Sequence, residues 1–378
     1  MSYRYGASYL DPGLNTLVAP TGTVVYNLYS WGQNNFGQLG LGTTTYYSSP
    51  KQVGSLTNWA SVTAGSNSSL AVKTDGTLWA WGQNITGNLG LGNLTYYSSP
   101  KQIGALTNWS KVYMGSGTSY AIKTDGTLWA WGLNNYGQLG LNNITSYSSP
   151  KQVGALTNWS SISGGANVAF AIKTDGTLWS WGGGTYGQLG FGNTTNYSSP
   201  KQVGALTNWL AVSASGYYNV ISVKTNGTLW SWGYNGYGQL GQGNITNYSS
   251  PKQIGALTNW SSVSTSRVSS FSIKTDGTLW SWGRNLYGIL GIGNNTNYSS
   301  PKQVGALTTW SKINCGNSSA YAIQSNGTLW AWGYNAYGQL GFGNTTYYSS
   351  PKQVGSLTSW YSLSGTSNTL QAVLALAY

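Results

Sequence analysis

Four aspartates recur along this chain of 378 residues, and carboxylates are among the side chains most used in acid–base and metal chemistry. They are Asp75, Asp125, Asp175 and Asp276, and each is followed by glycine. Asn226 and Asn326 take the same place in two further copies, which a turn tolerates and an acid or a calcium site does not. We therefore interpret the aspartates as turn residues that accept local backbone hydrogen bonds.

The remaining composition excludes most catalytic sites. The chain has no histidine and only five acidic residues, none of them glutamate, so it lacks an imidazole base and a paired-glutamate site. Its single cysteine, Cys315, cannot form a disulfide within the chain or a cysteine-rich zinc site. The glycine-rich segment at residues 37–42 lacks the lysine and Ser/Thr of a phosphate loop. We predict a protein that is not an enzyme and that uses no metal or cofactor.

A second periodic set consists of lysines in the motif Pro-Lys-Gln. Its members are Lys51, Lys101, Lys151, Lys201, Lys252, Lys302 and Lys352. Rotational repetition would place them in one ring, which could dock on an anionic surface such as an acidic polysaccharide or another protein. The alternative is that they are solvated lysines that keep the protein soluble. The net charge is +12, but no cluster of Lys and Arg occurs, so a nucleic-acid partner is not expected.

The elements that carry these residues follow from a repeat of 50 residues, once 51. Trp-Gly recurs seven times, at Trp31, Trp81, Trp131, Trp181, Trp232, Trp282 and Trp332. Within each unit, two short apolar runs flank Asp-Gly or Asn-Gly, which predicts a tight β-hairpin. Short strands, dense turns and this period are typical of a four-stranded propeller blade. The sequence predicts an all-β, seven-bladed β-propeller.

The two ends of the chain indicate how the ring closes. The last repeat stops at Tyr378 without its Trp-x-Trp-Gly strand, and residues 21–32 form an orphan copy of that missing piece. We expect the N- and C-terminal strands to pair in one shared blade, which removes two exposed sheet edges. Residues 21–378 would then form the propeller, and residues 1–20 an N-terminal extension that could act as an anchor. No run approaches the roughly 18 apolar residues of a membrane span.

The repeat also resembles that of a known family. The segments WGxNxxGQLGLG, Pro-x-x-Val and A-(I/V)-x-x-(D/N)-G-T-L-W-x-W-G are similar to the repeat of the regulator of chromosome condensation family. The resemblance covers residues 21–378 and implies a seven-bladed propeller. The family includes an exchange factor for a small GTPase, ubiquitin-ligase modules, a light sensor and secreted inhibitors of β-lactamase, so the fold alone does not specify a function.

Differences among the seven copies point to candidate binding residues. Variation concentrates in residues 63–69 and their equivalents, and in the residues that follow Trp-Gly. The asymmetric residues there include Tyr217, Tyr218, Arg267 and Arg284. Loops on a rigid scaffold commonly carry binding sites, although drift in unconstrained loops produces the same pattern.

Composition then favours one function among several. Only 6% of residues are charged, and Asn, Ser, Thr, Gly and Tyr dominate, as in exposed microbial and viral surface proteins. We expect a binding or structural propeller of a virion or cell exterior, with a protein or surface polysaccharide as partner and with residues 1–20 contacting other virion proteins. The alternatives are a cytoplasmic regulator that acts on a GTPase or chromatin, and a propeller-type protein inhibitor.

Overall fold

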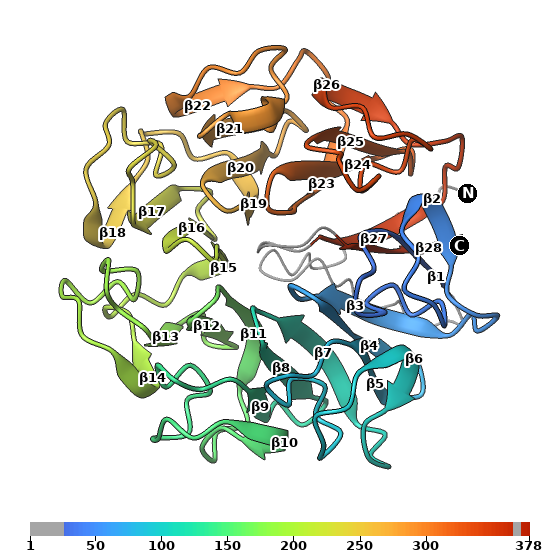
Figure 1. Cartoon of the computed structure of the whole chain (residues 1–378). Helices are drawn as coiled ribbons and strands as arrows, with labels where there is room; N and C mark the ends of the chain where they lie inside the picture. Colours follow the sequence, from blue (N-terminus) through green and yellow to red (C-terminus); the bar gives the residue numbers. More distant parts are fainter. Residues whose placement is uncertain (1–25, 366–371) are drawn as a thin grey trace, which may run out of the picture.

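Seven four-stranded antiparallel sheets form a closed ring in the computed structural model, which describes residues 26–365 and 372–378 (Figure 1). The prediction of an all-β, seven-bladed propeller is confirmed. The predicted extension at residues 1–20 lies outside the described residues. We number the blades 1 to 6 in chain order from β3 to β26, and the closing sheet is blade 7.

Each blade uses its strands in the same way, from the axis of the ring to its perimeter. The innermost strands are β3 (Trp59–Ala64), β7 (Trp109–Met114), β11 (Trp159–Gly164), β15 (Trp209–Ala214), β19 (Trp260–Thr265), β23 (Trp310–Cys315) and β27 (Trp360–Gly365). The second strands are β4 (Ser68–Lys73), β8 (Thr118–Lys123), β12 (Val168–Lys173), β16 (Asn219–Lys224), β20 (Ser269–Lys274), β24 (Ser319–Gln324) and β28 (Ala372–Ala377). The third strands are β5 (Leu78–Gly82), β9 (Leu128–Gly132), β13 (Leu178–Gly182), β17 (Leu229–Gly233), β21 (Leu279–Gly283), β25 (Leu329–Gly333) and β1 (Asn27–Gly32). The outer strands are β6 (Tyr97–Gln102), β10 (Tyr147–Gln152), β14 (Tyr197–Gln202), β18 (Tyr248–Gln253), β22 (Tyr298–Gln303), β26 (Tyr348–Gln353) and β2 (Tyr47–Gln52).

The helical content of the described residues is one short turn, η1 (Leu286–Gly288). No helix in this part of the chain is long and apolar enough to cross a membrane.

The Asp-Gly turns join the second and third strands, as predicted. In blade 1, Asp75 Oδ1 accepts hydrogen bonds from the backbone N–H of Thr77 at 2.9 Å and from its hydroxyl at 2.6 Å. The Thr77 hydroxyl oxygen in turn accepts the indole N–H of Trp79 at 2.8 Å. Gly76 has a φ of +76°, a conformation that glycine adopts without steric penalty. The carboxylate is thus occupied in shaping the hairpin.

Tryptophans of the Trp-Gly series join each blade to the one before it. All seven are fully buried, and each indole N–H donates to a main-chain carbonyl of the preceding blade at 2.7–2.9 Å. In blade 1 the pair is Trp81 and the carbonyl of Gln38. Gly40 gives the indole room, since a Cβ on this residue would lie 2.7 Å from Trp81 Nε1. The core therefore consists of seven layers between blades rather than one central cluster.

Blade 7 closes the ring with strands from both ends of the chain, which confirms the predicted closure. Its order is β2-β1-β28-β27, and β1 pairs with β28 from Asn27↔Ala377 to Gly32↔Ala372. The rings of Tyr26 and Tyr361 stack beside this seam with their centroids 4.2 Å apart. Because β1 and β28 each pair with a strand on both sides, neither terminal strand exposes unpaired backbone groups at a sheet edge.

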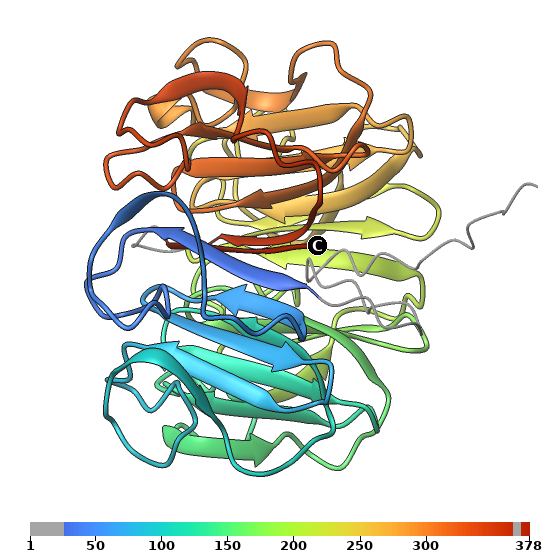
Figure 2. The same ribbon diagram turned by 90° about the vertical axis from the view of Figure 1, so that its right-hand side faces the viewer.

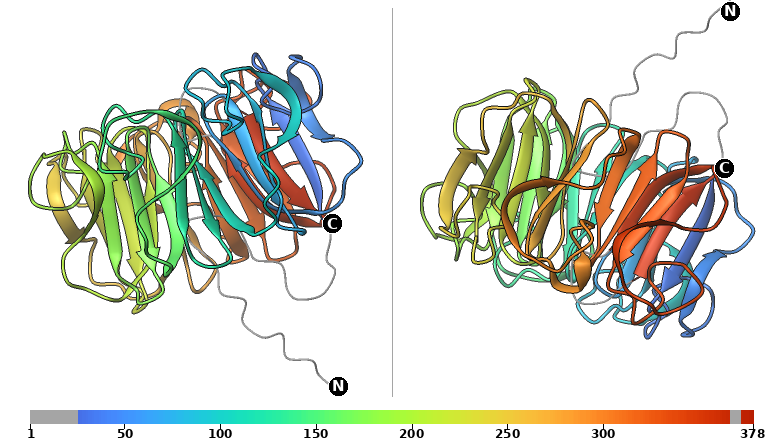
Figure 3. Two further views of the ribbon diagram at one scale, coloured as in Figure 1. Left: turned by 90° about the horizontal axis from the view of Figure 1, so that it is seen from below. Right: turned by 90° about the horizontal axis from the view of Figure 1, so that it is seen from above.

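The strands run from one face of the ring to the other, as the edge-on views show (Figures 2 and 3). One face carries the loops between first and second strands and the long loops between third and outer strands, and we call it the loop face. The opposite face carries the Asp-Gly turns, and we call it the hairpin face. The two kinds of loop that vary most among the repeats therefore share one face.

Lys312 lies at the seam between blades 6 and 7. Its ammonium group donates a hydrogen bond to the carbonyl of Tyr361 and lies 4.3 Å from the centroid of the Tyr361 ring. Burial lowers the pKa of Lys312 to about 8, because removal from water disfavours the charged form.

We predict that replacing Trp232 by Phe lowers the free energy of unfolding more than replacing Trp282 by Phe. Among the described residues, the carbonyl of Gln188 accepts only the Trp232 indole N–H, whereas the carbonyl of Gln239 also accepts the Ser270 hydroxyl at 2.7 Å. An unsatisfied buried carbonyl costs about 1–3 kcal/mol, so the two variants should differ by that order. Denaturant unfolding of both variants measures the difference, and equal losses would contradict the role of the carbonyl.

We also predict that stability rises between pH 8 and pH 9.5 because of Lys312. The pKa of this lysine is lowered in the folded protein, so the unfolded chain binds more protons in that interval and folding gains as the pH increases. The contribution of one proton is bounded by about 1.4 kcal/mol per pH unit. Urea unfolding of the wild type and of Lys312→Met at several pH values should show a steeper rise for the wild type. The exposed Lys302→Met is the control, and parallel profiles for all three proteins would refute the assignment.

Candidate functional site

Backbone hydrogen bonds join the two kinds of variable loop on the loop face. In blade 4 the N–H of Tyr234 donates to the carbonyl of Tyr218 at 3.0 Å. In blade 5 the N–H of Arg284 donates to the carbonyl of Val268 at the same distance. Residues that lie far apart in the repeat are therefore held side by side, and a ligand on this face would meet both loops at once.

Buried asparagines make the long loops rigid. Asn235 is fully buried, and its amide donates to the carbonyls of Asn244 and Thr246 at 3.0 and 2.9 Å while its side-chain oxygen accepts the N–H of Leu240 at 2.9 Å. Equivalent asparagines occur in every blade except blade 3, where Gly184 takes the position. The loops therefore present their surface side chains from a fixed backbone.

The four asymmetric residues singled out from the sequence come together on blades 4 and 5. The Arg267 guanidinium lies 3.7 Å from the centroid of the Tyr217 ring, a cation–π contact between neighbouring blades. The Arg284 guanidinium lies 4.8 Å from the ring of Tyr237. Tyr218 stacks on Tyr186 of blade 3, with centroids 4.8 Å apart and planes at 30°. Tyr218 and both arginines thus pack on a tyrosine of another loop, and Tyr217 supplies the ring on which Arg267 packs.

Further tyrosines extend this group toward blades 6 and 7. The rings of Tyr287, Tyr334 and Tyr347 form a triangle with centroid distances of 4.8, 4.9 and 5.3 Å. Tyr334 also contacts Tyr337 at 6.1 Å, and Tyr337 contacts Tyr46 of blade 7 at 5.9 Å. Burial and the neighbouring tyrosines raise the pKa of Tyr334, so its hydroxyl is uncharged at neutral pH.

We call this set of residues the Tyr–Arg arc. Its members, in chain order, are Tyr46, Tyr186, Tyr217, Tyr218, Tyr234, Tyr237, Arg267, Arg284, Tyr287, Tyr334, Tyr337 and Tyr347.

The charge of the arc is not balanced on its own face. Burial and the nearby charge of Arg284 lower the pKa of Arg267. All four aspartates of the described residues lie in the Asp-Gly turns, on the hairpin face. Within residues 26–365 and 372–378 neither arginine is paired with a carboxylate, and no three His, Cys, Asp or Glu residues are grouped to hold a metal. The arrangement suits an anionic group brought by a ligand.

One substitution in the repeat explains the position of Tyr287. In five blades a glutamine follows this position by two residues, and its side-chain oxygen accepts the backbone N–H at 2.8–2.9 Å. In blade 5 the equivalent residue is Ile289, whose side chain cannot accept a hydrogen bond. The loop forms η1 instead, and Tyr287 adopts a φ of +62°, which is uncommon for a non-glycine residue. Its ring thereby contacts Tyr334 and Tyr347.

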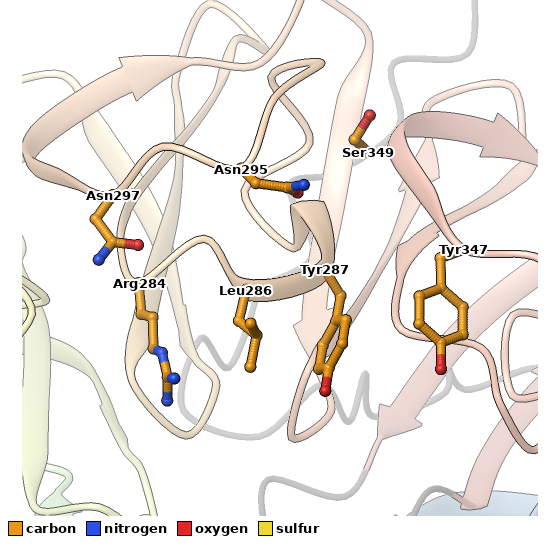
Figure 4. Close-up of a pocket in the computed structure, with 7 residues that line it drawn as sticks. All are labelled: Arg284, Leu286, Tyr287, Asn295, Asn297, Tyr347 and Ser349. Atoms are coloured by element: carbon orange, nitrogen blue, oxygen red, sulfur yellow. The ribbon is translucent and has the colours of Figure 1, made fainter.

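A cavity of about 540 Å³ lies beside this rearranged loop. It is lined by Arg284, Leu286, Tyr287, Asn295, Asn297, Tyr347 and Ser349, which come from blades 5 and 6. The side chains of Arg284, Leu286, Tyr287 and Tyr347 extend in the same direction from neighbouring loops (Figure 4). The cavity is therefore bounded by two tyrosine rings, one guanidinium and several neutral polar groups.

The seven lysines of the Pro-Lys-Gln motif lie elsewhere, on the outer strands at the perimeter of the ring. All seven are exposed, and each ammonium lies 4.1–5.7 Å from the ring of the tyrosine four residues earlier. They are spaced around the molecule rather than gathered in one patch. The docking ring stays a prediction, and its position separates it from the Tyr–Arg arc.

We predict that Ile289→Gln returns the blade 5 loop to the conformation of the other blades. The new side-chain oxygen would accept the N–H of Tyr287, whose φ should become negative and whose ring should leave Tyr334. The crystal structure of the variant tests this directly. The reciprocal change Gln239→Ile is the matched control, since it removes the same bond from Tyr237. An unchanged Tyr287 in the first variant would contradict the explanation.

Comparisons with known proteins agree with this architecture. A model of the RCC1-like domain matches residues 27–265, and models of the Regulator of chromosome condensation (RCC1) repeat match residues 276–323, 326–364 and 310–339. No curated protein sequence gives a significant match.

Solved propellers superpose on nearly the whole chain. Human WBSCR16 does so with a TM-score of 0.82 at 21% identity, covering 93% of this chain and 98% of its own. Prp20p of Saccharomyces cerevisiae gives 0.83 at 19% identity, with coverage of 100% and 96%. Yeast RCC1 (Prp20) bound to Kap60 gives 0.83 at 18% identity, with coverage of 100% and 94%. At these identities the likeness shows the fold, and the family follows from the sequence models. The chain belongs to the regulator of chromosome condensation (RCC1) repeat family.

Proposed function

We propose that this chain is a non-enzymatic binding propeller that holds its partner on the loop face, through the Tyr–Arg arc. The observation that carries the proposal is the meeting of Tyr217, Tyr218, Arg267 and Arg284, the residues that break the repeat, on one face. Tyrosine and arginine are also the residues most enriched in binding hot spots, together with tryptophan.

The rigidity of the supporting loops favours the same function. The buried hydrogen bonds of Asn235 fix the long loop that carries Tyr234 and Tyr237, so little backbone entropy is lost when a ligand binds there. Tyrosines supply large contact areas at low conformational cost, as they do in antibody loops. Membership of the RCC1 repeat family also supports a binding or regulatory role.

The surface chemistry supports an exposed location for this binding. Uncharged polar residues and tyrosine dominate, and 6% of residues are charged. We propose a protein of the cell exterior or of a virion, with a protein or surface polysaccharide as partner. The alternative is an intracellular regulator or a propeller-type inhibitor; among structural relatives, Prp20p is described with its binding properties to Gsp1p and histones.

Density-gradient fractionation of the native source, followed by mass spectrometry for this chain, distinguishes an exterior or virion protein from an intracellular regulator. Co-sedimentation with envelopes or virions is the expected result. Recovery as a free soluble protein, or in a complex with a GTPase or chromatin, would replace the proposal with the regulator.

We predict that the double variant Arg267→Gln/Arg284→Gln binds stripped envelopes or virions at least about tenfold more weakly than the wild type, because it loses two charge-assisted contacts. The double variant Lys151→Gln/Lys302→Gln removes the same charge from the perimeter and should bind normally. Quantitative co-sedimentation of the purified proteins measures both. A loss confined to the lysine variant would transfer the binding site to the perimeter ring.

A further inference from the structure

We infer that the cavity between blades 5 and 6 is a carbohydrate site, and that it takes a sugar unit carrying a carboxylate, such as a uronic acid, within an acidic glycan. The inference rests on the proposed function, since the cavity belongs to the same face and shares Arg284, Tyr287 and Tyr347 with the Tyr–Arg arc.

The shape and walls of the cavity suit a sugar ring. Its volume of about 540 Å³ falls in the range of about 300–1,000 Å³ that is usual for small-molecule sites. Tyr287 and Tyr347 are 38% and 43% exposed, and their rings meet at 83°, so they form two walls of a corner. Tyrosine offers an apolar ring face together with a polar hydroxyl, which matches the apolar face and hydroxylated rim of a sugar.

The remaining lining supplies neutral hydrogen-bonding groups. Asn295 is exposed and makes no side-chain hydrogen bond within the described residues. The Asn297 side-chain oxygen accepts the N–H of Asn285 at 2.8 Å, which leaves its amide N–H groups for a ligand. Ser349 adds a hydroxyl. Amides and hydroxyls both donate and accept, as recognition of sugar hydroxyls requires.

Arg284 gives the site its preference for an acidic unit. The Arg284 guanidinium lies 4.8 Å from the centroid of the Tyr237 ring, and its N–H groups have no carboxylate partner in the described residues. A guanidinium edge binds a carboxylate through two parallel hydrogen bonds. The described aspartates all lie on the hairpin face, so no carboxylate of these residues competes for that edge.

An acidic peptide would offer the same carboxylate, but the lining fits it less well. Leu286 is the only aliphatic side chain among the seven lining residues. Peptide anchors generally fill apolar, fully desolvated pockets.

Ile289 also distinguishes this loop from the other six, so one site per chain is expected, in contrast to the sevenfold lysine ring.

Isothermal titration with trigalacturonate tests the inference, with maltotriose as the neutral sugar and triglutamate as the acidic peptide. We expect one site per chain, with trigalacturonate binding at least tenfold more tightly than either control. Arg284→Gln and Tyr287→Ala should each weaken binding tenfold or more. Tyr136→Ala, at the same position of blade 2 and 41% exposed, should leave it unchanged. Ile289→Gln should weaken binding although Ile289 is not itself a lining residue.

The outcomes separate this inference from the proposed function. Equal or tighter binding of triglutamate, or binding unaffected by Arg284→Gln, would overturn the carbohydrate site. If trigalacturonate does not bind while the arginine double variant still loses envelope or virion binding, the sugar assignment fails and the binding face stands. If the arc variants change neither trigalacturonate binding nor envelope or virion binding, both the carbohydrate site and the proposed binding face are wrong.

Discussion

An indole N–H bonded to a buried main-chain carbonyl joins each blade to its predecessor, and most of the molecule follows from this contact. The carbonyl belongs to the turn of the long loop, two residues after the tyrosine position of the Tyr–Arg arc in blades 4 and 5. Because the acceptor is the backbone, the side chain there is free to change: Ile289 still accepts the Trp332 indole at 2.7 Å. The contact that stabilises the ring therefore permits variation on its surface.

This separation explains how a sevenfold scaffold carries a single site. The buried tryptophans, glycines and asparagines barely vary among the repeats, since each satisfies a backbone group or fills a close contact. The surface side chains have no such constraint. A change such as Ile289 alters one loop without disturbing the blades on either side, and the resulting asymmetry creates the tyrosine triangle and the cavity beside it.

The fold was predictable from the sequence because the period, the Asp-Gly turns and the incomplete end repeats each have a direct structural meaning. The candidate site was predictable only in part. Tyr217, Tyr218, Arg267 and Arg284 stand out because they break the repeat, but their proximity depends on which loops share a face. The arc tyrosines such as Tyr287 were missed since they occupy ordinary repeat positions. The signal that could have found this one was Ile289, the single residue of its type in the GQLG motif.

Blade 7 also determines how the propeller responds to mechanical force. The register of β1 and β28 places Asn27 opposite Ala377, so β1 begins and β28 finishes at the same end of this strand pair. Tension applied between Asn27 and Ala377 would load the residue pairs one after another, as in a zipper, and the two strands would separate at low force. Tension applied through only one end and a ligand on the loop face is transmitted instead across the tryptophan layers between blades, which bear the load together. A protein tethered at one end thus resists shear far better than one pulled at both.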